Sequence, residues 1–108
     1  MILLQEITAE QLEEKNDYLL FIHTPFCGTC HVARSFLEKI EKTHQQDIFY
    51  EMNASLYPEF MQKYKVESVP CLFIMKENEV KEKVYTFYSI SNIYHYVWTY
   101  VPGLFQQE

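Results

Sequence analysis

The stretch Phe26-Cys27-Gly28-Thr29-Cys30-His31 is the most informative part of this sequence. Two residues separate its two cysteines, which lie between the apolar run 18–22 and a long amphipathic segment. At the start of a helix, free backbone N–H groups and the helix dipole favour a thiolate. The spacing therefore predicts a reactive pair, with Cys27 as the nucleophile and Cys30, one helical turn further on, as the resolving thiol.

A helix is predicted from Cys27 to about Thr43. Its apolar residues recur with helical spacing and form one stripe, which consists of Val32, Ala33, Phe36, Leu37 and Ile40. The polar residues between them are expected to face water, and these are Arg34, Glu38, Glu41 and Lys42.

Strands are predicted from apolar runs and from alternation. Residues 18–22 and 71–75 are continuously apolar, as in strands covered on both faces of a sheet. Residues 80–87 follow a hairpin turn at 76–79 and carry alternating lysines, which suits an exposed edge strand. The remaining strands are expected at residues 2–5 and 48–52.

Three further helices are predicted from residues that favour helix starts. Thr8 precedes a helix over 9–15, with Gln11 completing a capping box. Ser55 is expected to cap a short helix with Pro58 in its first turn. The last helix begins at Ser89 or Ser91, and its apolar stripe is Ile90, Ile93, Val97 and Val101.

The predicted order of elements is β-α-β-α-β-α-β-β-α. Alternating strands and helices that end in a hairpin indicate a mixed sheet with helices on both faces. We therefore expect a single α/β domain over residues 1–108, with a central mixed β-sheet of about five strands flanked by about four helices.

Composition excludes several classes of protein. The 9 basic and 15 acidic residues give a net charge of −6 without a basic cluster, which argues against nucleic-acid binding. Three cysteines do not suit a secreted disulfide scaffold. The first residues lack a basic signal-peptide region, so a reducing, cytoplasmic setting is expected. The uncharged stretch 84–107 is interrupted too often by polar residues to predict a membrane span.

The segment Phe26–His31 and the segment Glu67-Ser68-Val69-Pro70 together resemble the thioredoxin family, and the resemblance covers nearly the whole chain. The first segment is similar to the family's redox motif and the second to its cis-proline loop. The resemblance implies the thioredoxin fold, a cis Pro70 packed over the disulfide, and a Val69 backbone that pairs with an extended substrate segment. A cis peptide bond before proline marks a constrained turn.

This chain departs from the family pattern around the cysteines. Phe26 stands where thioredoxins usually have tryptophan, and Gly28-Thr29 replaces the usual Gly-Pro. Both differences are expected to shift the reduction potential and the fit of substrates.

The family's buried aspartate, six residues before the first cysteine, is replaced by Phe21. We hypothesise that Glu51, on a neighbouring strand, takes over proton transfer, with a pKa raised by burial so that it accepts the Cys30 proton. The alternative is an ordinary exposed glutamate at a strand end.

Cys71 directly follows Pro70 in an apolar run, which is typical of a small buried side chain. A second interpretation gives it a redox or metal role, with Cys27, Cys30 and His31 or His23 as further ligands. Zinc sites commonly pair two closely spaced cysteine couples, and this chain has one couple, so no metal is expected.

The resemblance implies a thiol-disulfide oxidoreductase that reduces disulfide-containing proteins and is recycled by an external flavoprotein reductase. No cofactor is expected in the chain itself, because two glycines cannot form a dinucleotide-binding fingerprint. Two alternatives stay open. Thr24-Pro25-Phe26-Cys27 resembles the entry to a glutaredoxin motif, and a thioredoxin-fold binding module with little redox activity would tolerate the missing acid.

Overall fold

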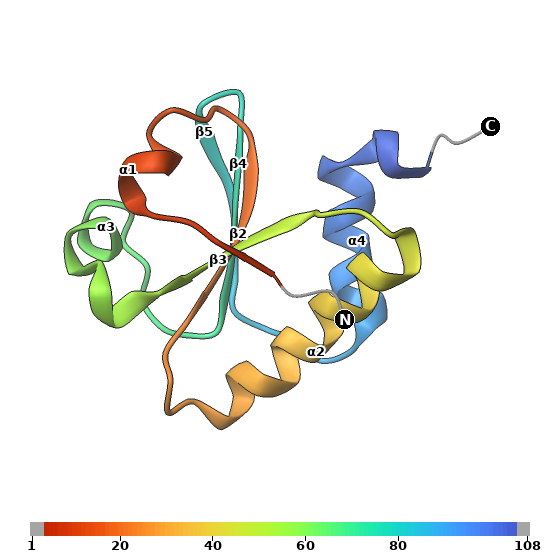
Figure 1. Cartoon of the computed structure of the whole chain (residues 1–108), viewed down its shortest axis with the longest axis horizontal. Coiled ribbons are helices and arrows are strands. Elements are labelled where there is room, and N and C mark those ends of the chain that lie inside the picture. Colours follow the sequence, from red (N-terminus) through yellow and green to blue (C-terminus); the bar gives the residue numbers. More distant parts are fainter. Residues whose placement is uncertain (1–3, 106–108) are drawn as a thin grey trace.

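The computed structural model describes residues 4–105, in which five strands form one sheet of order β1-β3-β2-β4-β5 (Figure 1). The strands β1, β3 and β2 are mutually parallel, whereas β4 is antiparallel to β2 and β5 is antiparallel to β4. Their bounds are β1 Gln5–Glu6, β2 Tyr18–His23, β3 Phe49–Asn53, β4 Cys71–Lys76 and β5 Glu79–Val84. The mixed sheet predicted from the sequence is therefore confirmed.

Four α-helices cover both faces of this sheet, as the order of elements predicted. They are α1 Ala9–Leu12, α2 Gly28–His44, α3 Pro58–Lys63 and α4 Ile90–Tyr100. Two short 3₁₀ segments, Ala54–Leu56 and Pro102–Phe105, follow β3 and α4. In Figure 1 the helices α1 and α3 lie on one side of the sheet, and α2 and α4 lie on the other.

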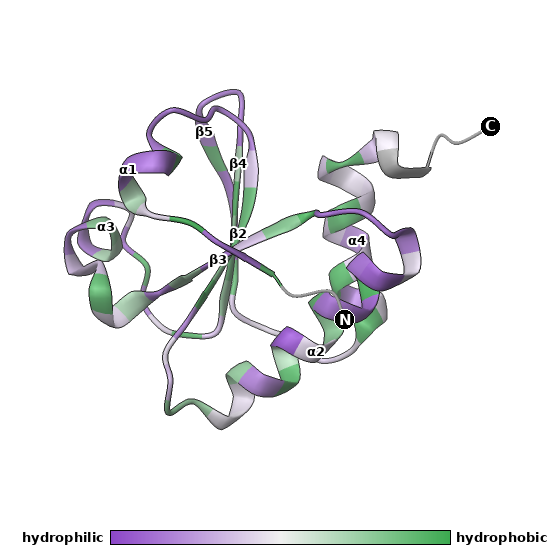
Figure 2. Ribbon diagram, in the orientation of Figure 1, coloured by the Kyte–Doolittle hydropathy of each residue, from purple (hydrophilic) through white to green (hydrophobic). Residues whose placement is uncertain are grey.

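The sheet separates two hydrophobic cores, because successive side chains of a strand point to opposite faces. On the side of α2 and α4, Phe21 and Leu72 pack with Ala33, Leu37 and Ile93. The opposite core contains the alternate strand residues together with side chains from α1 and α3, namely Leu20, Ile22, Cys71, Phe73, Leu12 and Phe60. Figure 2 accordingly shows hydrophobic residues along the central strands and hydrophilic residues in the hairpin between β4 and β5.

Helix starts follow the capping residues in two of the predicted cases. Thr8 caps α1 and Ser89 caps α4, and each forms a capping box with the residue three positions later. The last helix therefore begins after Ser89 and not after Ser91. Within it, Ile93 and Val97 are fully buried, while Ile90 and Val101 are partly buried.

The prediction that Ser55 caps the helix after β3 is wrong. Ser55 lies inside the 3₁₀ segment, whose cap is the Asn53 side chain. The helix α3 begins only at Pro58, with Tyr57 before it. A proline suits the first helical position, where no N–H is needed, and it disfavours helical backbone in the residue before it.

The ends of the other elements differ from the predictions by a few residues. The helix α1 ends at Leu12, and β1 is limited to Gln5 and Glu6, which pair with Tyr50 and Glu51 of β3. Residues 2 and 3 of the predicted first strand lie outside the described residues. The strand β5 ends at Val84, short of the predicted Phe87.

Val32 and Glu41 of α2 do not lie as predicted. Val32 is 53% exposed and lies outside the buried apolar stripe of α2, which consists of Cys30, Ala33, Leu37 and Ile40. Glu41 is fully buried, whereas it was expected to face water. Its Oε2 accepts the backbone N–H groups of Ile48 and Phe49, each at 2.9 Å, so the carboxylate fixes the start of β3.

The hairpin between β4 and β5 turns at the predicted place. Glu77 and Asn78 both adopt left-handed backbone conformations, as a two-residue turn of this hand requires. The Glu77 N–H donates to Asp17 Oδ1 at 2.8 Å, and the Asn78 N–H donates to the carbonyl of Asn16. The segment before β2 thus holds the hairpin in place.

Among the residues that the structure describes, no helix combines the length and the apolar character needed to cross a membrane.

Candidate active site

The strand β2 and the helix α2 bring the two cysteines together. The strand ends at His23, a short loop follows, and Cys27 caps α2 with extended backbone (φ −118°). Cys27 and Cys30 form a disulfide with their Cα atoms 5.2 Å apart. The pairing that the spacing predicted is therefore present.

The Cys27 sulfur has two hydrogen-bonding neighbours. The Cys30 backbone N–H donates to it at 3.2 Å, and Thr29 Oγ1 lies 3.4 Å away. When the disulfide is reduced, both groups are able to donate to a Cys27 thiolate, and donors of this kind lower a thiol pKa. Cys30 is 4% exposed and lies deeper than the half-buried Cys27, so Cys27 is the more accessible of the two cysteines.

The surface beside the disulfide is open on the side of Phe26 and Gly28. The Phe26 side chain is fully exposed, although it is a large apolar group. A Cβ atom added to Gly28 would meet no heavy atom within 4 Å. Packing thus explains neither residue type, and both are free to contact another molecule.

Val69 and Pro70 lie at the same end of the sheet as the disulfide. The bond between them is cis, as the family resemblance implied. Pro70 is buried and leads directly into β4, whose first residue, Cys71, pairs with Ile22 near the end of β2. Both Val69 and Cys27 pack against the core under α2. The backbone of Val69 is therefore next to the end of the sheet that carries the redox pair.

Cys71 faces away from this pair. It packs in the core under α1 and α3, while Cys30 packs in the core under α2 and α4. It is fully buried, and burial raises the pKa of its thiol to about 12, although Lys83 and a hydrogen bond with Tyr85 act in the opposite direction. The sheet thus separates Cys71 from Cys30, which contradicts a direct redox role.

The same geometry contradicts the alternative of a metal site. Cys71 and Cys30 lie on opposite faces, His31 is exposed to solvent, and His23 is engaged with Glu51. Within residues 4–105, no three side chains of the metal-binding types form a group that could hold an ion.

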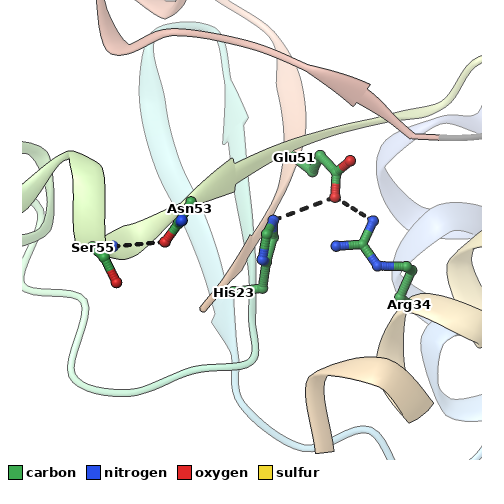
Figure 3. Close-up of polar contacts among 5 residues, drawn as sticks. All are labelled: His23, Arg34, Glu51, Asn53 and Ser55. Atoms are coloured by element: carbon green, nitrogen blue, oxygen red, sulfur yellow. Dashed lines mark hydrogen bonds and ion pairs between the residues drawn. The ribbon is translucent and has the colours of Figure 1, made fainter. Parts of the chain in front are cut away.

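Glu51 is buried and lies between two basic side chains. It is 8% exposed, accepts a hydrogen bond from Arg34 through Oε1, and lies 3.3 Å from His23 Nε2 through the same oxygen. Figure 3 shows the carboxylate between the His23 ring and the Arg34 guanidinium, while Asn53 turns away toward Ser55. This arrangement rules out the alternative of an ordinary exposed glutamate.

The expected rise in the pKa of Glu51 is wrong in direction. Burial by itself raises the pKa of this carboxyl, but the hydrogen bonds and charges of His23 and Arg34 outweigh burial and hold the pKa below its usual value. Glu51 is consequently ionised near neutral pH and is a weaker proton acceptor than hypothesised.

The Phe21 ring forms one side of this arrangement. Phe21 pairs with Glu51 across the sheet, its ring stacks on His23 with centroids 5.6 Å apart, and the Arg34 guanidinium carbon lies 5.5 Å from its ring centroid. Arg34, predicted to face water, is partly buried in this arrangement. The missed signal is its spacing, since a residue four positions after Cys30 lies on the same side of α2.

Comparison with known proteins agrees with this geometry. A family model described as Thioredoxin matches residues 3–97. The thioredoxin-like protein YusE of Bacillus subtilis (strain 168) is 34% identical over 96 residues, which cover 87% of this chain and 91% of YusE.

Two solved structures share the fold at low sequence identity. Thioredoxin from Trypanosoma brucei brucei has a TM-score of 0.76 and 15% identity, and the match covers 92% of this chain and 91% of that one. Oxidised thioredoxin from Plasmodium falciparum has a TM-score of 0.72 and 16% identity, covering 90% and 97%. The family match, the curated relative, the fold and the cysteine pair at the start of α2 agree, and this chain belongs to the thioredoxin family.

Proposed function

We propose that this protein is a thiol-disulfide oxidoreductase that reduces disulfides in other proteins. The observation that carries the proposal is the difference between the two sulfurs. Cys27 is accessible and has the Cys30 N–H and the Thr29 hydroxyl beside it, whereas Cys30 is buried behind it. One thiol is thus suited to attack and the other to resolve.

The proposed reaction consists of two exchanges. The Cys27 thiolate attacks one sulfur of the substrate disulfide, a Cys27–substrate bond forms, and the other substrate sulfur leaves as a thiolate. Cys30 then loses its proton and attacks Cys27, which releases the second substrate sulfur and leaves the Cys27–Cys30 disulfide. The two protons of the dithiol pass to the two substrate thiolates, so the substrate is reduced and the protein is oxidised.

The substrate is proposed to lie across the Val69–Pro70 bend and the exposed Phe26 ring. An extended peptide would pair with the Val69 backbone, and Phe26, Gly28 and Thr29 would contact its flanking residues. A fully exposed aromatic ring gains buried area when a partner covers it, which favours binding at this position.

Electrons for the next cycle are proposed to come from an external flavoprotein reductase in the cytoplasm, so that the protein acts as an electron carrier without a cofactor of its own. A reducing role predicts a reduction potential of about −270 mV, the value typical of thioredoxin. Equilibration with a glutathione or thioredoxin redox buffer measures it, and a value as oxidising as about −120 mV would contradict a reducing role.

The central experiment is mixed-disulfide trapping. The variant Cys30→Ser cannot resolve, so it should accumulate covalent complexes with cellular proteins through Cys27. The double variant Cys27→Ser/Cys30→Ser is the matched control, because it keeps the fold and lacks the attacking sulfur. Equal, background-level capture by both variants would contradict the reductase and favour a binding module.

A substrate comparison separates this proposal from a glutaredoxin-like activity. The reduced wild-type protein is expected to reduce insulin more readily than a mixed disulfide of glutathione. The reverse preference would assign the protein to reduction of glutathione adducts. Adding a thioredoxin reductase and NADPH to the insulin assay tests recycling, with turnover beyond one equivalent as the expected result.

A further inference from the structure

The three charged or titratable side chains His23, Arg34 and Glu51 form a cluster that the proposed exchange steps do not use. We propose that this cluster is an electrostatic regulator of the redox pair, in which Glu51 is the positioning residue and the net charge of the cluster sets how readily the Cys27 thiol ionises. The proposal rests on the proposed function for its biological meaning, whereas its test needs only the reduced protein.

The cluster joins the elements that carry the redox pair. His23 is the last residue of β2, four positions before Cys27, and Arg34 lies four positions after Cys30 on α2. Four residues of helix advance about 6 Å along the axis, so Arg34 is roughly one turn behind Cys30. Glu51, from β3, contacts both basic side chains with a single oxygen.

The side chains of the cluster are partly buried, so solvent screens their charges only weakly. The Glu51 side chain is 11% exposed, and those of His23 and Arg34 are 16% and 26% exposed. Partly buried charges are screened by solvent and salt far less than exposed ones. The ring of Phe21 covers one side of both basic groups and excludes water there.

Among the described residues of the neighbouring strands, the charged group beside the cluster is the exposed Glu6 of β1, which pairs with Glu51. On β3 the partner of His23 in the sheet is the uncharged Asn53, and on β4 the residues opposite Ile22 and Phe21 are Cys71 and Leu72. On α2 the titratable residues within about one turn of Arg34 are the exposed His31 and the partly buried Glu38. The His31→Asn background removes His31 from the measurements below.

The net charge of the cluster has two values. Arg34 contributes +1 and Glu51 contributes −1, so the sum is 0 when His23 is neutral and +1 when His23 is protonated. A nearby positive charge stabilises a thiolate and therefore lowers the thiol pKa. A more positive cluster is thus expected to favour the thiolate form of Cys27.

The decisive test uses substitutions with opposite charge effects. Glu51→Gln leaves Arg34 uncompensated and should increase the thiolate fraction of Cys27 at a pH below its pKa. Arg34→Gln leaves Glu51 uncompensated and should decrease that fraction. We expect changes of about threefold or more, equivalent to roughly half a pKa unit, in opposite directions. The readout is the pH dependence of Cys27 alkylation in the Cys30→Ser variant, supported by thiolate ultraviolet absorbance.

Loss of packing cannot imitate this result. If either substitution merely loosened the loop, both variants would shift the thiol in the same direction. The double variant Arg34→Gln/Glu51→Gln restores the net charge and should return toward the wild-type profile. The charge-matched controls Glu59→Gln and Lys39→Gln alter exposed residues of α3 and α2 and should leave the profile unchanged.

His23→Asn removes the other basic contact of Glu51. It should decrease the thiolate fraction of Cys27, as Arg34→Gln does. Shifts of the same sign for Glu51→Gln and Arg34→Gln, or no shift in either, would overturn the proposal even if trapping succeeds. Conversely, opposite shifts together with an empty trap would uphold the cluster and reject the proposed function.

Discussion

Thr29 supplies a hydroxyl to the Cys27 sulfur at a position where many thioredoxins have proline. Its Oγ1 lies 3.4 Å from that sulfur, and the residue itself is exposed. A hydroxyl can donate to a thiolate, whereas a proline ring has no comparable donor. The departure from the family pattern therefore adds a stabilising contact on the outer thiol.

Thr29→Val removes this hydroxyl and keeps the shape of the side chain. The pKa of the Cys27 thiol should rise, and the thiolate fraction at a pH below that pKa should fall about threefold to tenfold. Alkylation rates measured against pH check the effect. Thr29→Ser keeps the donor, so equal slowing in both variants would contradict the role of the hydroxyl.

The contact of Glu41 with the start of β3 was not predicted from the sequence and is seen only in the structure. Its Oε2 accepts two backbone N–H groups at the start of β3, while Oε1 has no hydrogen-bond partner among the described residues. Burial raises the pKa of this carboxyl, with Asp47 and Glu38 adding to the effect and the two backbone bonds opposing it. Its ionised form is therefore less favourable in the folded state than in the unfolded state.

Because the pKa of Glu41 is raised in the folded state, the free energy of unfolding depends on pH. A raised folded-state pKa adds stability that is fully present below the unfolded value of 4.5 and is lost as pH rises through the folded value. Glu41→Gln should remove this dependence while keeping an acceptor for both N–H groups. Urea unfolding at several pH values measures it, with Glu59→Gln as an exposed control.

Glu41→Met tests the structural half of the same role. It leaves the N–H groups of Ile48 and Phe49 without their acceptor, and we expect a loss of about 2 to 4 kcal/mol in the free energy of unfolding. A loss below about 0.5 kcal/mol would show that the carboxylate does not hold the start of β3.

Single residues were predictable where local spacing carried the information. The pairing of Cys27 with Cys30 follows from their separation and from the helix start. The contacts of Glu51 with His23 and Arg34 depend on which strands are neighbours and in what register, and no local pattern contains that information. The expected rise in the pKa of Glu51 was wrong because the hypothesis considered burial alone, and the contacts with His23 and Arg34 that lower the pKa could not be read from the sequence.

At the scale of elements, helix and strand types were predicted correctly from periodicity and capping, while several boundaries were not. Thr8 and Ser89 each have a partner three residues later that completes the cap. Ser55 lacks that advantage, because Pro58 sets the start of α3 and the Asn53 side chain takes the cap position. Where a possible serine cap and a proline both indicate a helix start, the proline sets the start, because it restricts the backbone of the residue before it.

The β4–β5 hairpin offers a test at this scale. Glu77 has a left-handed backbone (φ 54°), which asparagine tolerates better than glutamate. Glu77→Asn keeps the N–H donated to Asp17 and should stabilise the fold by about 0.5 to 1 kcal/mol, measured by urea unfolding. The neighbouring Asn78→Ala, which places alanine at φ 63°, should destabilise it. Opposite results for the pair would contradict backbone strain as the cause.

At the scale of the whole molecule, the architecture was predicted from the resemblance to the thioredoxin family. The two segments that carry the resemblance, 26–31 and 67–70, are far apart in the sequence and lie at the same end of the sheet. The sheet order and the separation into two cores required the structure, since the element order allows several arrangements of parallel and antiparallel strands. The separation matters for function because it assigns Cys30 and Cys71 to different surroundings.

The redox pair also links chemistry to global stability. The disulfide closes a loop of four residues, Cys27 to Cys30, and chain entropy assigns such a closure a stabilisation of about 2 kcal/mol. Oxidised protein, measured without a reductant, should therefore unfold at a higher urea concentration than reduced protein, measured with a reductant. Coincident transitions would mean that the reduced pair keeps an equally stable native loop.

The position of Cys71 behind the sheet has a consequence for how the chain matures. Three cysteines allow three different pairings, and a partly folded chain can sample them all. Once the sheet forms, Cys71 is enclosed in one core with a weakly acidic thiol, and the other two sulfurs meet on the opposite side. Once the central strands have assembled, the sheet therefore keeps Cys71 away from the other two sulfurs and leaves Cys27–Cys30 as the disulfide that the folded chain can hold.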